Sequence, residues 1–206
     1  MMSLSRDLDC CHLKTKITLS FATIFIILAL IIITQGSLPC DGWISSHISS
    51  LYSDTLTSVM KLISDINAMR ESLALSLVFV LWLVYKKWYK EAKIYTTSLF
   101  LSIFAFASLK HLIARARPES ILVNAHNYSF PSGHSTMSMA MALGVYFVFA
   151  NKTQKRTLLL AGTILWAILV GLSRIYLNVH WCSDVLAGWS LGVVCAVVAQ
   201  TILSKI

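Results

Sequence analysis

Three clusters of polar residues interrupt an otherwise apolar chain, and they hold residue types that bind or attack a phosphoryl group. The clusters are Lys110 with Arg117 and Pro118, then Pro131, Ser132, Gly133 and His134, and finally Ser173, Arg174, His180 and Asp184. Charged and polar groups are costly inside apolar segments, so we treat all three clusters as parts of a candidate site.

The basic members of the clusters fit an anion clamp. A guanidinium group can donate two parallel hydrogen bonds to phosphate oxygens, and a lysine adds a compact positive charge. We therefore expect Lys110, Arg117 and Arg174 to hold a phosphate. Ser132 and Gly133 come directly before an apolar run, at the start of a predicted helix whose free amides and dipole favour an anion. The missing side chain of Gly133 also lets the backbone approach the ligand.

Two histidines and a carboxylate supply the reactive groups. His180 and Asp184 are four residues apart, which on a helix places them on one face. The carboxylate can then accept a hydrogen bond from one imidazole nitrogen and leave the other nitrogen free to attack. His134 begins a different predicted helix and is available to protonate the departing oxygen. The pattern predicts one nucleophilic histidine and one histidine that acts as general acid.

The elements that must position these residues are predicted to be membrane helices. Of 206 residues, 57% are hydrophobic and 13% are charged, and the mean hydropathy of +0.73 is too high for an ordinary soluble domain. The segments apolar enough to cross a hydrocarbon core of about 30 Å are residues 17–35, 72–89, 94–110, 135–150, 157–176 and 184–203. In the second segment, Trp88 and Tyr89 are interpreted as an interfacial anchor. We expect a single all-α domain over residues 1–206, a six-helix transmembrane bundle.

The basic residues predict how this bundle is oriented. The net charge is +8, and in a membrane protein such an excess is first compared with the loops rather than with nucleic-acid binding. If the N-terminus is cytoplasmic, eleven of the 17 Lys and Arg residues lie inside and six lie outside. Three of those six are Lys110, Arg117 and Arg174. The positive-inside rule therefore predicts an active site at the extracytoplasmic interface.

Two further features leave alternatives open. Residues 42–70 carry an apolar stripe typical of one or two interfacial helices, which either form a lip for a lipid tail or pack on the bundle, and packing is favoured. The cysteines show no spacing typical of a metal site. Cys40 and Cys182 fall on the same predicted side of the membrane, where they either pair in a disulfide or remain two free thiols.

The clusters, written KxxxxxxRP, PSGH and SRxxxxxHxxxD, resemble in residues and order the three signature motifs of the type 2 phosphatidic acid phosphatase superfamily. The similarity extends over about residues 95–203 and to the membrane-bound branch of that family. The resemblance implies that His180 becomes phosphorylated, that Asp184 orients it, and that His134 protonates the leaving group and later activates water. It also implies phosphate binding by Lys110, Arg117, Ser132, Gly133 and Arg174, and a reaction without a metal or other cofactor.

We therefore predict a lipid phosphatase of the bacterial inner membrane. Undecaprenyl diphosphate is the favoured substrate, with phosphatidylglycerol phosphate or phosphatidate hydrolysis and a lipid phosphotransferase as alternatives that use the same site. A transporter or scramblase would explain buried basic residues but not the histidine and carboxylate pair. The expected partners are the lipid substrate and the bilayer, with no nucleic acid and no obligatory protein partner. Four residues near the motifs are interpreted as packing residues: Arg115, His111, His126 and Glu119.

Overall fold

The computed structural model describes the backbone of residues 2–119, 122–125 and 127–204, and side chains from residue 12 onward within these ranges. All regular elements in this part of the chain are helical. They are α1 (Met2–Gln35), α2 (Pro39–His47), the 3-10 turn η1 (Ile48–Leu51), α3 (Asp54–Ile66), α4 (Met69–Tyr85), α5 (Tyr89–Ile113), α6 (Gly133–Phe149), α7 (Arg156–Tyr176) and α8 (Cys182–Ser204).

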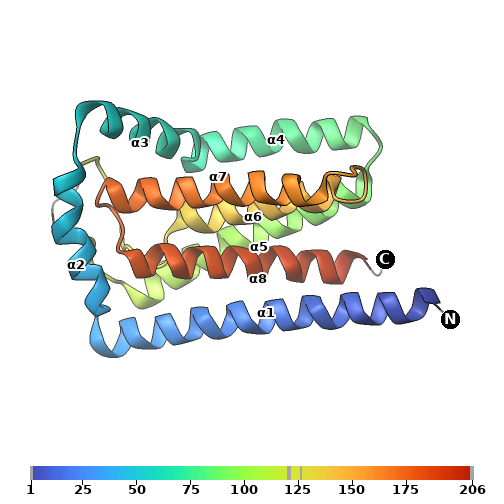
Figure 1. Cartoon of the computed structure of the whole chain (residues 1–206), viewed down its shortest axis with the longest axis horizontal. Coiled ribbons are helices and arrows are strands. Elements are labelled where there is room, and N and C mark those ends of the chain that lie inside the picture. Colours follow the sequence, from blue (N-terminus) through green and yellow to red (C-terminus); the bar gives the residue numbers. More distant parts are fainter. Residues whose placement is uncertain (1, 120–121, 126, 205–206) are drawn as a thin grey trace.

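The long helices run side by side, and the two chain ends lie at the same end of the bundle (Figure 1). The short helix α2 lies across the opposite end, and α3 leads from it into α4. The axes of α3 and α4 differ by 52° at the break between them. The bundle therefore has one end that carries the termini and another that is covered by the segment between α1 and α4.

Each of the six predicted segments overlaps one long helix, and these helices are α1, α4, α5, α6, α7 and α8. Within the described residues, α1, α5, α7 and α8 are long and apolar enough to cross a membrane, and α3 with α4 forms a bent pair that passes the same test together. The 17-residue α6 is shorter than these spans. The all-helical class is thus confirmed, whereas the count of six spans stays a prediction.

The second predicted segment runs past the end of its helix. The second segment is predicted to continue to Tyr89, but α4 ends at Tyr85 and Tyr89 already begins α5. Lys87 adopts a positive φ of 60° in the turn between them. Lys86 and Lys87 interrupt the apolar run at this turn, and the prediction passes it because Trp88 and Tyr89 are interpreted as an anchor of the same segment.

Helices α6 and α8 approach closely because glycines replace larger residues at their contact. A Cβ atom on Gly188 would lie 2.7 Å from the carbonyl oxygen of Ser132, and one on Gly192 would lie 2.6 Å from that of Thr136. Small residues four apart are a common means of bringing two membrane helices together. This contact sets the start of α6 against the start of α8, and both starts carry candidate catalytic residues.

The segment before α4 packs on the bundle, as the sequence analysis favours. The hydroxyl of Tyr176 at the end of α7 accepts a hydrogen bond from the Ser53 amide at 3.3 Å and lies 2.9 Å from the Thr57 hydroxyl. Apolar side chains of α3, including Leu56 and Met60, pack against the buried Tyr176, Leu177 and Val179. These contacts place α3 over the end of α7 that carries Arg174.

Candidate active site

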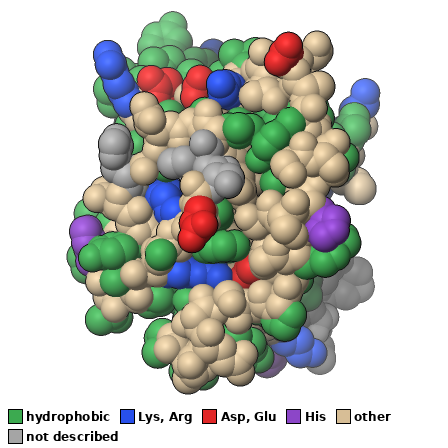
Figure 2. Space-filling model, turned by 90° about the vertical axis from the view of Figure 1, so that its left-hand side faces the viewer, with side chains coloured by type: hydrophobic (Ala, Val, Ile, Leu, Met, Phe, Trp, Pro, Cys, Tyr) green, Lys and Arg blue, Asp and Glu red, His purple; other side chains and the backbone are tan. Residues whose placement is uncertain are grey.

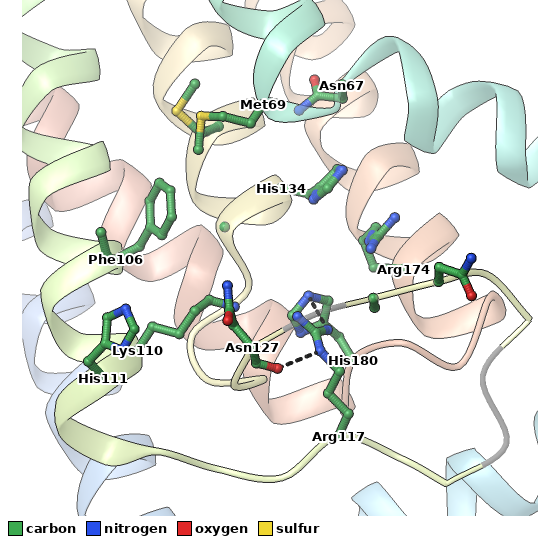
Figure 3. A pocket seen from close by; sticks show the side chains of 15 residues that line it. Asn67, Met69, Phe106, Lys110, His111, Arg117, Asn127, His134, Arg174 and His180 are labelled. Atoms are coloured by element: carbon green, nitrogen blue, oxygen red, sulfur yellow. Dashed lines mark hydrogen bonds between the residues drawn. The ribbon is translucent and has the colours of Figure 1, made fainter.

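A cavity of about 380 Å³ opens at the bundle end that α2 and α3 cover, and the three sequence clusters meet in it. Of the predicted site residues, those that line it are Lys110, Arg117, Gly133, His134, Arg174 and His180. Figure 3 shows His134 and His180 within the same pocket, with Lys110 on one side and Arg174 on the other. The space-filling view of this end shows Lys and Arg side chains set into the surface near its centre (Figure 2).

Arg117 is anchored by backbone carbonyls, which leaves its position well defined. Its Nε donates to the carbonyl of Asn127 at 3.0 Å, its Nη1 to that of Val179 at 2.6 Å and its Nη2 to that of Tyr128 at 3.2 Å. Its Nη1 also lies 3.3 Å from Nε2 of His180. A phosphate bound by Arg117 would therefore lie beside the outward nitrogen of that histidine.

Two further cations complete the predicted clamp. Lys110, in the last turn of α5, donates to the carbonyl of Tyr128 at 2.6 Å. Arg174, in the last turn of α7, is buried, and its Nη1 donates to the Ser64 hydroxyl of α3. Its Nε has no hydrogen-bond partner among the described residues although it is buried. A buried donor without a partner is costly, and a phosphate oxygen would satisfy it.

The start of α6 is built as the sequence analysis expects, with one difference. The backbone of Gly133 lines the cavity, and a Cβ atom there would lie 3.1 Å from the Phe106 ring. Ser132 is fully buried, and its hydroxyl caps the helix by accepting hydrogen bonds from the amide and hydroxyl of Ser135 at 3.4 and 3.0 Å. The capping hydroxyl is not among the cavity-lining groups, so phosphate binding by Ser132 stays a prediction.

His180 and Asp184 are held in the predicted pairing. Nδ1 of His180 lies 3.3 Å from Oδ2 of Asp184, and that oxygen also accepts the Trp181 amide at 3.0 Å. Burial, followed by the charges of Arg174, Arg117 and Lys110, lowers the pKa of His180 well below its ordinary value of 6.5. His180 is therefore neutral at physiological pH, with Nδ1 facing the carboxylate and Nε2 facing the cavity.

A buried ionic network that was not predicted from the sequence lies behind this pair. Arg115, interpreted as a packing residue, donates from Nη1 to Oδ1 of Asp184 at 2.5 Å and from Nη2 to Oδ2 of Asp41 at 2.8 Å. Its Nη1 also donates to the Ser183 hydroxyl at 2.7 Å. Burial opposes ionisation of Asp41, but hydrogen bonds from Ser183 and Arg115 outweigh it, and the pKa of Asp41 lies below its ordinary value.

The remaining packing interpretations have different outcomes. His111 lines the cavity, and its ring packs edge-on against Tyr128. Glu119 is exposed, so its interpretation as a packing residue is wrong, and His126 lies outside the described residues. Asn67, the residue directly after α3, was not singled out, yet it lines the cavity and its buried Nδ2 has no partner among the described residues.

Cys40 and Cys182 are both free thiols in the structure. They stand next to Asp41 and Ser183, whose side chains are hydrogen bonded to each other at 2.6 Å. No group of three or more His, Cys, Asp or Glu side chains in the described part of the chain is arranged to hold a metal ion. The cofactor-free reaction is a prediction for experiment to test.

The sequence profile of the PAP2 superfamily matches residues 91–206, which contain all three clusters. The chain belongs to the PAP2 superfamily. This confirms the resemblance drawn from the motifs, and the predicted site residues of this PAP2 protein all lie in the part of the chain that matches the family. Asp41, Ser64 and Asn67 lie before that part, in the segment that crosses the end of the bundle.

Named relatives of this PAP2 protein act on lipid phosphates. It is 47% identical over 92 residues to phosphatidylglycerophosphatase B of Bacillus subtilis, covering 41% of this chain and 44% of the relative. It is 30% identical over 122 residues to undecaprenyl-diphosphatase of Sulfolobus acidocaldarius, covering 56% of each. The chain thus spans about half the length of these curated relatives.

A solved structure extends the likeness to nearly the whole fold. The crystal structure of a transmembrane PAP2 type phosphatidylglycerolphosphate phosphatase from Bacillus subtilis superposes with a TM-score of 0.84 and 28% identity. The match covers 92% of this chain and 96% of that one. Together with the apolar helices, this identifies the PAP2 protein described here as an integral membrane protein.

Proposed function

We propose that this protein is a membrane lipid phosphatase that works through a phosphohistidine at His180. The observation that carries the proposal is the placement of His180, whose Nδ1 lies 3.3 Å from Asp184 and whose Nε2 lies 3.3 Å from Arg117. This leaves a neutral nitrogen next to a fixed positive charge that can hold a phosphoryl group. The arrangement is that of a nucleophile with its orienting carboxylate.

In the first half-reaction, the phosphate binds to the guanidinium and ammonium groups of Arg117, Arg174 and Lys110. The Nε2 lone pair of His180 attacks phosphorus, a P–N bond forms, and the P–O bond to the leaving group breaks. The Asp184 carboxylate stabilises the positive charge that develops on the imidazole. His134 takes up a proton when the anionic phosphate binds and donates it to the departing oxygen, which prevents release of a high-energy anion.

In the second half-reaction, His134, now neutral, accepts a proton from a water molecule. The water oxygen attacks phosphorus, the P–N bond breaks, and inorganic phosphate leaves. The clamp residues hold the phosphoryl oxygens in both halves, so they stabilise the charge of each transition state. The cycle returns His180 to its neutral form and His134 to its protonated form.

The same proposal includes an orientation in the membrane. Six helices would span the bilayer with both chain ends in the cytoplasm, and the cavity would open at the extracytoplasmic interface of a bacterial inner membrane. In support, the cavity lies at the opposite end of the bundle from the termini (Figure 1). Lys86, Lys87, Lys90 and Lys93, near the turn between α4 and α5, fit the positive-inside rule in this orientation.

The substrate is proposed to be undecaprenyl diphosphate, because an outward-facing site would suit recycling of that carrier. Phosphatidylglycerol phosphate is the second candidate, and it is favoured by the names of the Bacillus subtilis relative and the solved structure. The residues of the cavity recognise the phosphate that both lipids share.

The test is phosphate release by the detergent-purified protein from undecaprenyl diphosphate, phosphatidylglycerol phosphate, phosphatidate and a soluble phosphate ester, with EDTA present. We expect release from at least one lipid, insensitive to EDTA and absent in His180→Ala. Inhibition by EDTA would contradict the metal-independent reaction. If no substrate releases phosphate, transfer to a second lipid is measured instead, and transfer would identify a phosphotransferase.

A further inference from the structure

The side chains of Asp41 and Arg115 form a buried series of ion pairs that ends at Asp184, the candidate catalytic carboxylate. Arg115 is 7% exposed and Asp41 is 1% exposed. The two terminal guanidinium nitrogens of Arg115 each contact a different carboxylate: Nη1 contacts Asp184 at 2.5 Å and Nη2 contacts Asp41 at 2.8 Å. The two oxygens of Asp184 are thereby divided between Arg115 and His180.

Asp41 is fixed from several directions. Its Oδ1 accepts the Ser183 amide at 2.9 Å, and its Oδ2 accepts the Ser183 hydroxyl at 2.6 Å and the Leu38 amide at 3.0 Å. The Leu38 contact caps the start of α2, where Pro39 is the first helical residue. Asp41 thus fastens α2 to the start of α8, one residue before Asp184.

The charges in this series of ion pairs explain why both Asp41 and Arg115 are needed. When His180 is neutral, the buried Asp184 carboxylate has Arg115 as its cationic contact, and a buried charge without a partner is strongly unfavourable. Without the guanidinium, Asp184 would favour its protonated form or turn away, and it would then no longer accept a hydrogen bond from Nδ1. Asp41 keeps Arg115 in place because it binds the other guanidinium nitrogen. The Trp181 ring, 5.3 Å from the guanidinium carbon, covers the same group.

We propose that Asp41 and Arg115 are positioning residues that keep Asp184 ionised and aimed at His180, and so keep the His180 proton on Nδ1 and Nε2 free to attack. The inference rests on the proposed phosphatase function. It adds to the active site a residue of α2, which lies outside the region matched by the family profile. Neither residue touches the phosphate in this account.

Kinetics distinguish this role from a purely structural one. Asp41→Asn and Arg115→Gln are expected to lower kcat by roughly tenfold to a hundredfold, because small misplacements of a reacting group have effects of that size. KM should change little, since the clamp is intact. Arg115→Lys keeps the charge and should retain more activity than Arg115→Gln. The matched controls are Asp54→Asn and Arg70→Gln, which change exposed residues of the same types.

A double-mutant cycle asks whether the effect passes through Asp184. In an Asp184→Asn background, Arg115→Gln should change kcat by no more than about twofold, because residues that act through one another are not additive. If the losses of kcat caused by Asp184→Asn and Arg115→Gln simply multiplied in the double variant, the inference would be overturned. The inference would also be overturned if Asp41→Asn and Arg115→Gln had the same kcat as the control variants. The same holds if Arg115→Lys and Arg115→Gln lost kcat to the same extent. If Asp41→Asn does not fold, the two Arg115 variants decide the question.

A second readout needs no turnover. NMR spectra of the protein labelled with ¹⁵N-histidine report which ring nitrogen of His180 carries the proton. The His180 signals are assigned by their loss in His180→Asn. We expect a proton on Nδ1 in the wild-type protein and a mixture of tautomers in Arg115→Gln. An unchanged tautomer in a folded but slow Arg115→Gln protein would show a structural role only and overturn the proposal. A wild-type protein that releases no phosphate would refute the proposed function, while the tautomer measurement would still test the positioning role.

Discussion

His180 and Asp184 face each other across one turn, with Nδ1 3.3 Å from Oδ2, at the point where the chain enters α8. Asp184 lies in the first turn of that helix, whereas His180 lies in the loop just before it. The same carboxylate oxygen accepts the Trp181 amide, so the turn itself holds the carboxylate toward the histidine. The geometry fixes which imidazole nitrogen is free to react.

Asp184→Asn is expected to lower kcat by roughly 10²- to 10⁴-fold, because an amide cannot replace the carboxylate that orients a catalytic histidine and stabilises its charge. KM should stay close to the wild-type value, since Asp184 does not line the cavity. Steady-state kinetics on the preferred lipid, with Asp54→Asn as control, provide the measurement. A loss of less than tenfold would contradict the orienting role.

The acid side of the pH profile should reflect the lowered pKa of His180. The nucleophile must be neutral, so kcat/KM of the wild-type protein should persist as the pH falls through 6.5 and decline only below it. Arg117→Gln removes one of the charges that lower this pKa and should move the decline to higher pH. The control is Arg70→Gln with the same substrate. Ionisation of the substrate phosphate then affects the pH profile of every protein equally. A decline at the same pH in both variants would contradict this assignment.

Arg174 should contribute to anion binding beyond its charge. Its buried Nε has no partner among the described residues, and a phosphate oxygen can accept that hydrogen bond. Arg174→Lys keeps the charge but loses the planar set of donors, so vanadate should inhibit this variant about tenfold more weakly than the wild-type protein. Inhibition constants for wild type, Arg174→Lys and Arg70→Lys test this. Equal constants in all three proteins would exclude the bidentate contact.

The contact between α6 and α8 offers a test of the framework. Gly188→Ala would place a Cβ atom 2.7 Å from the Ser132 carbonyl, a backbone atom that cannot move without displacing the start of α6. We expect a loss of about 1–3 kcal/mol in stability, from overpacking, and reduced kcat. Gly162→Ala is the matched control, because nothing lies within 4 Å of its added Cβ. Thermal unfolding in detergent should separate the two variants, and equal melting temperatures would contradict the close contact.

The helices and the convergence of the motifs could be predicted from the sequence because both depend on local patterns. Apolar runs mark the long helices, and polar clusters at their ends must meet when the helices pack in a bundle. The Asp41–Arg115 ion pair could not be predicted, because its members are 74 residues apart and Asp41 belongs to no motif. Likewise, the burial of the Ser132 hydroxyl could not be predicted. This hydroxyl accepts a hydrogen bond from the Ser135 hydroxyl at the start of α6, which competes with binding of a ligand.

The most direct test of the central claim is to trap the phosphoenzyme. The wild-type protein is mixed briefly with a lipid substrate labelled with ³²P in the transferable phosphate, quenched in alkali and digested, and the labelled peptide is sequenced by mass spectrometry. We predict an acid-labile, alkali-stable phosphate on His180 that is absent in a folded His180→Ala protein. Phosphate release with no label on His180, or wild-type turnover by His180→Ala, would contradict the phosphohistidine mechanism.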